Sequence, residues 1–352
     1  MFQAFAIVIA VTILWAPTAV GFTRSSASPS PFGTKSFLSI HDDNGSRRRD
    51  IAPTNCHKNR EKSTMKSSRT PISWGSSPYL AILTEPDACT SVERVEETIH
   101  AIEQATMDGG VNLVIVRVAD GPGNESALHK WALLKNLAEM KQRRRFLLVV
   151  NDDVEIVLKA LSQNITVDGV HVKEYKAHLI PSIRSKLEHA VTCSFNNNNS
   201  SSYRDVIIGT SCHSLESATK SYQLSPRGPD YLFVGTCYLT QSHPEKQSLD
   251  QLEGPTLPGR VREELYQIYN DKDGTSIDAE TIISRPTSTL SPPPIIFAIG
   301  GIDEQNCHEP VVRFGADGVA TISAVMQSSD PREVVRRMKS IMQNQKDNVD
   351  EK

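Results

Sequence analysis

The chain carries almost no surplus of charge, and this absence excludes one large class of proteins. Its 352 residues include 38 lysines and arginines against 41 aspartates and glutamates, a formal net charge of -3. Nucleic-acid-binding proteins usually show a basic excess gathered on one face, so no nucleic-acid partner is expected. A mean hydropathy of -0.33, with only one long apolar run, excludes a membrane protein with several spans.

Disulfide, zinc and dinucleotide motifs are missing as well. The six cysteines are scattered and none forms a C-x-x-C pair, so they predict neither a disulfide framework nor a zinc site. No G-x-G-x-x-G opens the first predicted helix, which argues against a dinucleotide-binding sheet. What remains is an α/β enzyme or binding domain, and a barrel of roughly 250 residues would fit within the chain.

The N-terminal segment does not have the pattern of a folded domain. Residues 1–21 are predicted to be a signal peptide, because the apolar stretch from Ala4 to Ala16 is too short to span a bilayer comfortably. Residues 22–78 are rich in Ser, Thr and Pro and more basic than acidic. This pairing resembles the bipartite plastid presequence of algae with secondary plastids, and it predicts a plastid protein with no membrane segment after processing. The alternative is secretion with a disordered propeptide, in which Asn124 and Asn164 would be glycosylation sites.

Strand-like and helix-like segments alternate eight times in residues 79–342. The strand-like runs are short, continuous and apolar, as in buried parallel sheets. They cover residues 79–83, 112–118, 146–150, 169–172, 206–209, 230–235, 294–299 and 318–323. Between them lie apolar stripes with helical spacing, formed by Val92, Val95, Ile99 and Ile102, by Leu133, Leu137 and Met140, and by Val334, Val335, Met338 and Met342. This alternation predicts a (β/α)8 barrel, a TIM barrel, rather than a doubly wound sheet.

Three polar segments interrupt or follow the pattern. Residues 196–202 and 271–293 are predicted to be solvated surface insertions without chemistry, because neither can bury enough apolar area to offset its chain entropy. Residues 343–352 are predicted to form a polar tail.

Polar residues follow the carboxyl ends of the predicted strands, and in a barrel these ends converge on one rim. The set comprises Arg117, Asn151, Asp152, His171, Ser211, His213, Thr240, Ser242, Gly300, Gly301 and Ser323. Any one of them has an ordinary structural explanation as a turn, a helix cap or a core histidine. Their joint placement at strand ends predicts a site.

The two glycines Gly300 and Gly301 are the most specific feature. Glycines after a buried strand let backbone amides approach an anion without interference from a Cβ. The loops after the seventh and eighth strands form the recurrent phosphate site of this fold. Amides near Ile322 and Ser323 are expected to complete it, so a phosphorylated small molecule is the predicted substrate class.

Several motifs together resemble one superfamily. They are Tyr79-Leu-Ala-Ile-Leu-Thr84, Leu147-Leu-Val-Val-Asn-Asp152, Asp168-Gly-Val-His171, Ile208-Gly-Thr-Ser-Cys-His213, Ala298-Ile-Gly-Gly-Ile302 and Gly315-Ala-Asp-Gly318. In order and spacing the chain resembles the thiamine phosphate synthase/TenI (thiazole tautomerase) superfamily. The resemblance implies an enzyme that binds thiazole phosphate, with Asn151, His171, Ser211, Thr240 and Ser242 as substrate-binding residues.

The resemblance leaves three activities open. A synthase would join aminopyrimidine methyl pyrophosphate to thiazole phosphate with Mg²⁺, and Asp152 matches one metal ligand. The second ligand position holds Lys176, a neighbouring glutamine is replaced by Glu174, and a lysine after the sixth strand is replaced by His243. A tautomerase needs no cofactor, and there His213 would transfer the proton while Arg117 binds the substrate carboxylate. The third option is a non-catalytic regulator that binds the same ligands. The oligomeric state is left open, with a homo-oligomer as one possibility.

Overall fold

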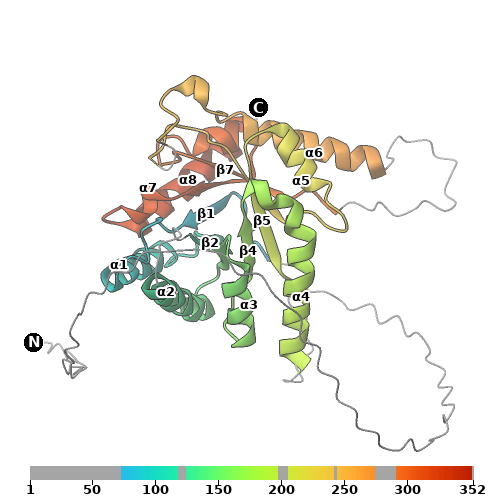
Figure 1. Ribbon diagram of the computed structural model, residues 1–352. Helices are drawn as coiled ribbons and strands as arrows, with labels where there is room; N and C mark the ends of the chain where they lie inside the picture. Colours follow the sequence, from blue (N-terminus) through green and yellow to red (C-terminus); the bar gives the residue numbers. More distant parts are fainter. Residues whose placement is uncertain (1–72, 118–123, 197–204, 242–243, 274–290, 351–352) are drawn as a thin grey trace, which may run out of the picture. The chain divides into compact units, whose positions relative to one another are not determined.

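A computed structural model describes residues 73–117, 124–196, 205–241, 244–273 and 291–350, all within one compact unit. The eight strands are β1 (Tyr79–Leu83), β2 (Leu113–Val116), β3 (Leu147–Asn151), β4 (Gly169–Val172), β5 (Ile207–Cys212), β6 (Tyr231–Val234), β7 (Ile295–Ile299) and β8 (Gly318–Thr321). Each pairs in parallel with the next, and β8 returns to β1 to close the barrel. The predicted (β/α)8 fold is confirmed (Figure 1).

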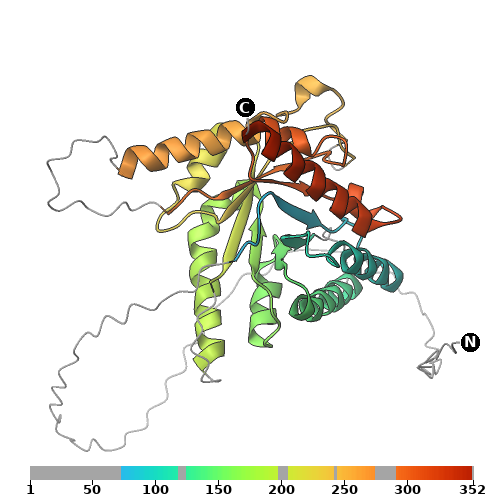
Figure 2. The same ribbon diagram turned by 180° about the vertical axis from the view of Figure 1, so that it is seen from behind.

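Helices surround the strands. They are α1 (Val92–Ala105), α2 (Asn124–Arg143), α3 (Val154–Ser162), α4 (Ile180–Asn196), α5 (Leu215–Tyr222), α6 (Leu257–Asp273), α7 (Ser323–Met326) and α8 (Pro331–Asp350). Three short turns, η1 (Glu174–Leu179), η2 (Leu249–Gln251) and η3 (Glu309–Arg313), lie in the connections. Figure 2 brings α8 to the near side of the barrel, where it packs against α1. No helix in the described part of the chain has both the length and the apolar character needed to cross a membrane.

The core has two layers, as expected for a filled barrel. Alternate strand residues point inward and form a cluster that includes Leu113, Ile207, Tyr231, Phe233 and Phe297. The residues between them pack outward against the helices, where the predicted stripes on α2 and α8 are buried. Cys89, Cys212, Cys237 and Cys307 are free and buried.

A repeated clamp closes the amino-terminal end of the barrel. The residue just before each even-numbered strand accepts a hydrogen bond from a backbone N–H of the preceding strand. These acceptors are Asn112, Asp168, Asp230 and Asp317, and their donors are Leu80, Leu148, Ile208 and Ile296. The three carboxylates also pair with cations of the helices, Lys141 of α2, Arg184 of α4 and Arg262 of α6. The clamp thus ties strand pairs to the surrounding helices.

Several predicted boundaries differ from the structure. β5 continues to Cys212 because the buried Thr210 hydroxyl donates to the Val172 carbonyl, which extends the pairing with β4. The single π turn η3, with a proline at its second position, replaces a helix between β7 and β8. Val92 is 54% exposed at the start of α1 and does not belong to the apolar stripe of that helix.

The predicted polar segments fall mostly outside the described residues. The helix α8 runs to Asp350, so the polar tail predicted for residues 343–352 is helical as far as residue 350. Residues 271–273 are the end of α6, while 274–290 and 197–202 lie outside the described residues. The predicted presequence lies outside them as well, except for residues 73–78.

Candidate active site

A cavity of about 380 Å³ opens at the carboxyl ends of the strands. It is lined by most of the residues that the sequence placed on this rim, namely Arg117, Asn151, His171, Ser211, His213, Thr240, Gly300, Gly301, Ile322 and Ser323. Asp152 lies beside the cavity and does not line it, and Ser242 and His243 fall outside the described residues. One cavity therefore collects these groups from seven of the eight strand ends, β2 to β8.

The loop after β7 shapes one side of the cavity. Gly300 and Gly301 have φ values of +101° and +64°, a backbone region that side chains with a Cβ rarely adopt. A Cβ on Gly301 would lie 2.5 Å from the Leu239 carbonyl oxygen, so only glycine fits. Asn306 donates to the Gly301 carbonyl at 2.8 Å and fixes the turn. Ile322 and Ser323 border the same space from β8 and α7, which gives the cavity the wall expected of a phosphate site.

His171 lies on the floor of the cavity as a neutral group. Its side chain is buried, with Nδ1 3.1 Å from the Tyr231 hydroxyl and Nε2 2.9 Å from the Ser211 hydroxyl. Burial lowers the pKa of His171 to about 3 and outweighs the opposing effect of the Asp152 carboxylate. The ring also lies 4.8 Å from Phe233, centroid to centroid. His171 is thus held rigidly and orients the Ser211 hydroxyl, which also lines the cavity.

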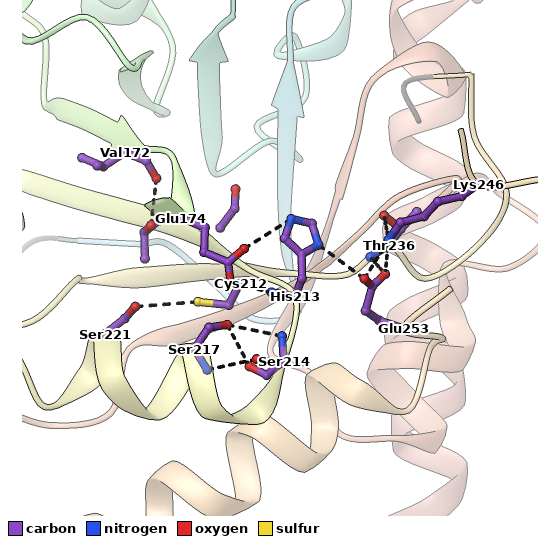
Figure 3. A network of polar contacts seen from close by, with 12 residues as sticks. Val172, Glu174, Cys212, His213, Ser214, Ser217, Ser221, Thr236, Lys246 and Glu253 are labelled. Atoms are coloured by element: carbon purple, nitrogen blue, oxygen red, sulfur yellow. Dashed lines mark hydrogen bonds and ion pairs between the residues drawn. The ribbon is translucent and has the colours of Figure 1, made fainter. Parts of the chain in front are cut away.

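His213 follows the end of β5 and lies between two carboxylates (Figure 3). Its Nε2 is 4.0 Å from an oxygen of Glu174, a residue that lines the cavity, and its Nδ1 is 3.7 Å from an oxygen of Glu253. The His213 backbone N–H also donates to Glu174 at 3.3 Å. The imidazole therefore lies at the edge of the cavity with a carboxylate on either side, and histidine is the side chain most often used for proton transfer in enzymes.

Arg117 supplies positive charge from the end of β2. Its backbone N–H donates to the Thr84 hydroxyl at 2.8 Å, and that hydroxyl donates to the Arg117 carbonyl at 2.6 Å. Burial lowers the pKa of Arg117, but a guanidinium remains charged. Within the described residues no carboxylate lies at ion-pair distance from this guanidinium, although it borders the cavity. It is therefore placed to bind an anionic ligand group.

Asp152 does not have the surroundings of a Mg²⁺ ligand. Lys176 Nζ donates to both of its carboxylate oxygens, at 3.0 and 2.9 Å, and Lys173 Nζ lies 3.3 Å away. No group of three or more His, Cys, Asp or Glu side chains in the described part of the chain could hold a metal ion. The two ammonium groups occupy the coordination directions that a cation would need, so these residues do not fit the metal site that the resemblance implies.

Sequence reasoning missed one part of the site. Glu253 and Lys246 lie in the loop after β6, where no regular pattern marked them, yet Glu253 comes close to His213. A glutamate directly before the Gly254-Pro255 turn was the only available indication, because such a turn returns the chain toward the strand end.

Fold and cavity together define a class, the (β/α)8 barrel with a small-molecule site at the carboxyl ends of its strands. A family model described as thiamine monophosphate synthase matches residues 80–256. The chain belongs to this thiamine monophosphate synthase family, and it is an enzyme of thiamine biosynthesis acting on small molecules.

Two thiamine-phosphate synthases among the relatives agree with this assignment. The thiamine-phosphate synthase of Geobacillus kaustophilus is 31% identical over 226 residues, which cover 64% of this chain and 77% of that protein. The thiamine-phosphate synthase of Thioalkalivibrio sulfidiphilus is 28% identical over 260 residues, 73% of this chain and 92% of that protein. A solved structure of thiamine phosphate pyrophosphorylase from Pyrococcus furiosus aligns with a TM-score of 0.48 at 20% identity, over 76% of this chain and 96% of that one.

Proposed function

We propose that the chain is a thiazole tautomerase, which moves a proton on a carboxylated thiazole phosphate without a metal ion. The observation that carries this proposal is the pairing of Asp152 with Lys176 and Lys173. A synthase would need this carboxylate for Mg²⁺, whereas proton transfer does not. The cavity otherwise keeps the groups that a phosphorylated, carboxylated heterocycle requires.

Each group then has a role. The glycine loop at Gly300 and Gly301 receives the phosphate, and the Arg117 guanidinium donates hydrogen bonds to both oxygens of the substrate carboxylate. The Nε2 of His213 accepts a proton from one ring position and returns a proton to another. One bond to hydrogen breaks and one forms, so both the imidazole and the composition of the substrate are restored.

A second candidate is thiamine-phosphate synthesis, which the names of the relatives favour. In that reaction thiazole phosphate displaces pyrophosphate from aminopyrimidine methyl pyrophosphate. Arg117 and the two lysines beside Asp152 would face the departing pyrophosphate. The residues around Asp152 do not fit Mg²⁺, so no step is assigned to the metal here.

One assay separates the candidates. The purified chain is incubated in D₂O with the carboxylated thiazole phosphate, and deuterium uptake is followed by NMR. Uptake that does not depend on Mg²⁺ supports the tautomerase. Formation of thiamine phosphate from the thiazole and aminopyrimidine substrates in the presence of Mg²⁺, without deuterium uptake, would support the synthase instead of the tautomerase. Tight binding with neither reaction would identify a regulator.

Variants of His213 and of the Asp152–Lys176 pair test the proposal further. His213→Ala is expected to lower deuterium uptake by about 100-fold or more, while thiazole phosphate binding stays near the wild-type value. His100→Ala, which replaces an exposed histidine on α1, is the matched control and should leave uptake unchanged.

Lys176→Asp places a second carboxylate beside Asp152 and is expected to create Mn²⁺ binding that the wild type lacks, measured by electron paramagnetic resonance. Wild-type Mn²⁺ binding that Asp152→Asn abolishes would contradict the metal-free site.

A further inference from the structure

The described parts of the connection after β6, residues 236–241 and 244–256, anchor the Glu253 carboxylate beside His213. Glu253 receives hydrogen bonds from Lys246 Nζ at 2.7 Å to each oxygen and from the Thr236 backbone N–H at 2.6 Å. The Gly254 N–H donates to the Thr236 carbonyl at 3.2 Å and fastens the loop to the end of β6. The Glu253 side chain is only 18% exposed. Three hydrogen bonds from two donor groups thus hold one carboxylate in a fixed place.

The two nitrogens of His213 face different surroundings. Nδ1 is fully buried and faces Glu253, at 3.7 Å. Nε2 lies on the side of Glu174, which borders the cavity and has a side chain that is 34% exposed. Figure 3 shows the imidazole between these two carboxylates, with Lys246 and Thr236 behind Glu253. The buried nitrogen and the cavity-side nitrogen are therefore distinguished by the fold itself.

We propose that Glu253 is a positioning residue that holds His213 in the tautomer with its proton on Nδ1, so that Nε2 is free to accept a proton at the cavity. Lys246 supports this role by keeping the Glu253 carboxylate in place. This inference rests on the proposed function only for its catalytic consequence, since the tautomer itself can be observed without substrate.

The electrostatics favour this assignment. Burial alone would raise the pKa of Glu253, but the hydrogen bonds from Lys246 and from the Thr236 backbone hold that pKa below its ordinary value. A carboxylate that stays ionised can only accept hydrogen bonds. The tautomer of His213 that carries its proton on Nδ1, the nitrogen facing Glu253, is therefore favoured. The distance of 3.7 Å is longer than a hydrogen bond, as catalytic contacts often are in structures without a bound ligand.

The first experiment reads the tautomer directly. Uniformly ¹⁵N-histidine-labelled protein is studied by NMR at a pH where His213 is neutral, and its resonances are assigned by comparison with His213→Ala. The wild type is expected to show the Nδ1–H form as the main species. Glu253→Gln should shift the population toward Nε2–H, because the amide NH₂ can donate to Nδ1. Glu216→Gln, which removes an exposed ion pair to Lys220 on α5, is the matched control and should leave the population unchanged.

The second experiment measures the catalytic consequence. Glu253→Gln is expected to lower the kcat of deuterium uptake by about tenfold or more with a nearly constant KM, and Glu253→Asp should restore part of it. Lys246→Met tests the support of the carboxylate in a variant that keeps Glu253, and it should shift the tautomer population in the same direction. Thermal unfolding of each variant checks that the barrel is intact.

The outcomes are distinct. An unchanged tautomer in both Glu253→Gln and Lys246→Met would overturn the positioning role, whatever the activity. An altered tautomer with no deuterium uptake in any protein, wild type included, would leave the positioning role in place and reject the proposed tautomerase.

Discussion

Gly301 is the residue on which the shape of the phosphate wall depends most directly. It combines a φ of +64° with a Leu239 carbonyl oxygen 2.5 Å from where its Cβ would be. Gly301→Ala is therefore expected to shift the loop and to weaken the binding of inorganic phosphate by about tenfold or more, measured by calorimetry. Gly109→Ala is the matched control, because Gly109 has a φ of +71° with nothing within 4 Å of its Cβ. Equal phosphate affinity in the two variants would contradict a phosphate site at this loop.

Single residues of the site were predictable where a strand end marked them. The glycine pair, His213 and Arg117 each follow a continuous apolar run, so the barrel rule places them at one rim. Lys176 was visible as a cation at the position of an expected metal ligand, but its two contacts with Asp152 depend on the fold of η1. Glu253 was not predictable, because a long irregular loop brings it back to His213.

At the scale of elements, the clamp at the amino-terminal end of the barrel predicts where stability is concentrated. Asp168 joins β4 to the Leu148 N–H of β3 and to Lys141 of α2, and its side chain is 7% exposed. Asp168→Ala leaves the partly buried Lys141 ammonium and the buried Leu148 backbone N–H without their acceptor. It is expected to lower the free energy of unfolding by about 3 kcal/mol or more, measured by urea denaturation.

The stability lost in Asp168→Ala should not be accompanied by a loss of catalytic activity. Residues at the amino-terminal end of a barrel support the fold, so Asp168→Ala should retain near wild-type kcat at low temperature. Glu216→Ala, which breaks the exposed pair with Lys220, is the control and should leave the urea midpoint unchanged. A strong loss of kcat in a folded Asp168→Ala protein would mean that the clamp acts on the site.

The order of elements was readable because strands buried on both faces form continuous apolar runs. All eight strands lie at or within two or three residues of the predicted ranges. The clamp residues were not recognised, since an aspartate before a strand also fits an ordinary turn, and only the closed barrel brings it against the neighbouring strand. The π turn after β7 was missed for a similar reason, because its sequence resembles a short helix.

At the scale of the whole molecule, plastid targeting by the N-terminal segment stays a prediction, because residues 1–72 lie outside the described residues. A fluorescent reporter fused to residues 1–78 and expressed in an alga with secondary plastids would test it. Fluorescence confined to the medium would favour secretion instead.

The pH dependence of global stability follows from His171, which every folded molecule must keep neutral. Its pKa is about 3 in the folded state and about 6.5 when the chain is unfolded. Between these pH values the histidine takes up a proton in the unfolded chain but not in the folded one. The free energy of unfolding therefore falls as pH decreases, by about 1.4 kcal/mol per pH unit once the pH is well below 6.5. Well above pH 6.5 the histidine is neutral in both states and this term vanishes.

His171→Gln isolates this term from the carboxylates that titrate at lower pH. Glutamine can still bond to the Ser211 and Tyr231 hydroxyls, which His171 contacts, but it takes up no proton in this range. Between pH 7 and pH 5 the wild type is expected to lose about 2 kcal/mol more unfolding free energy than the variant, measured by urea denaturation at both values. Parallel losses in the two proteins would show that His171 takes up its proton inside the folded barrel. His171 would then not be the neutral group at the floor of the cavity that orients the Ser211 hydroxyl.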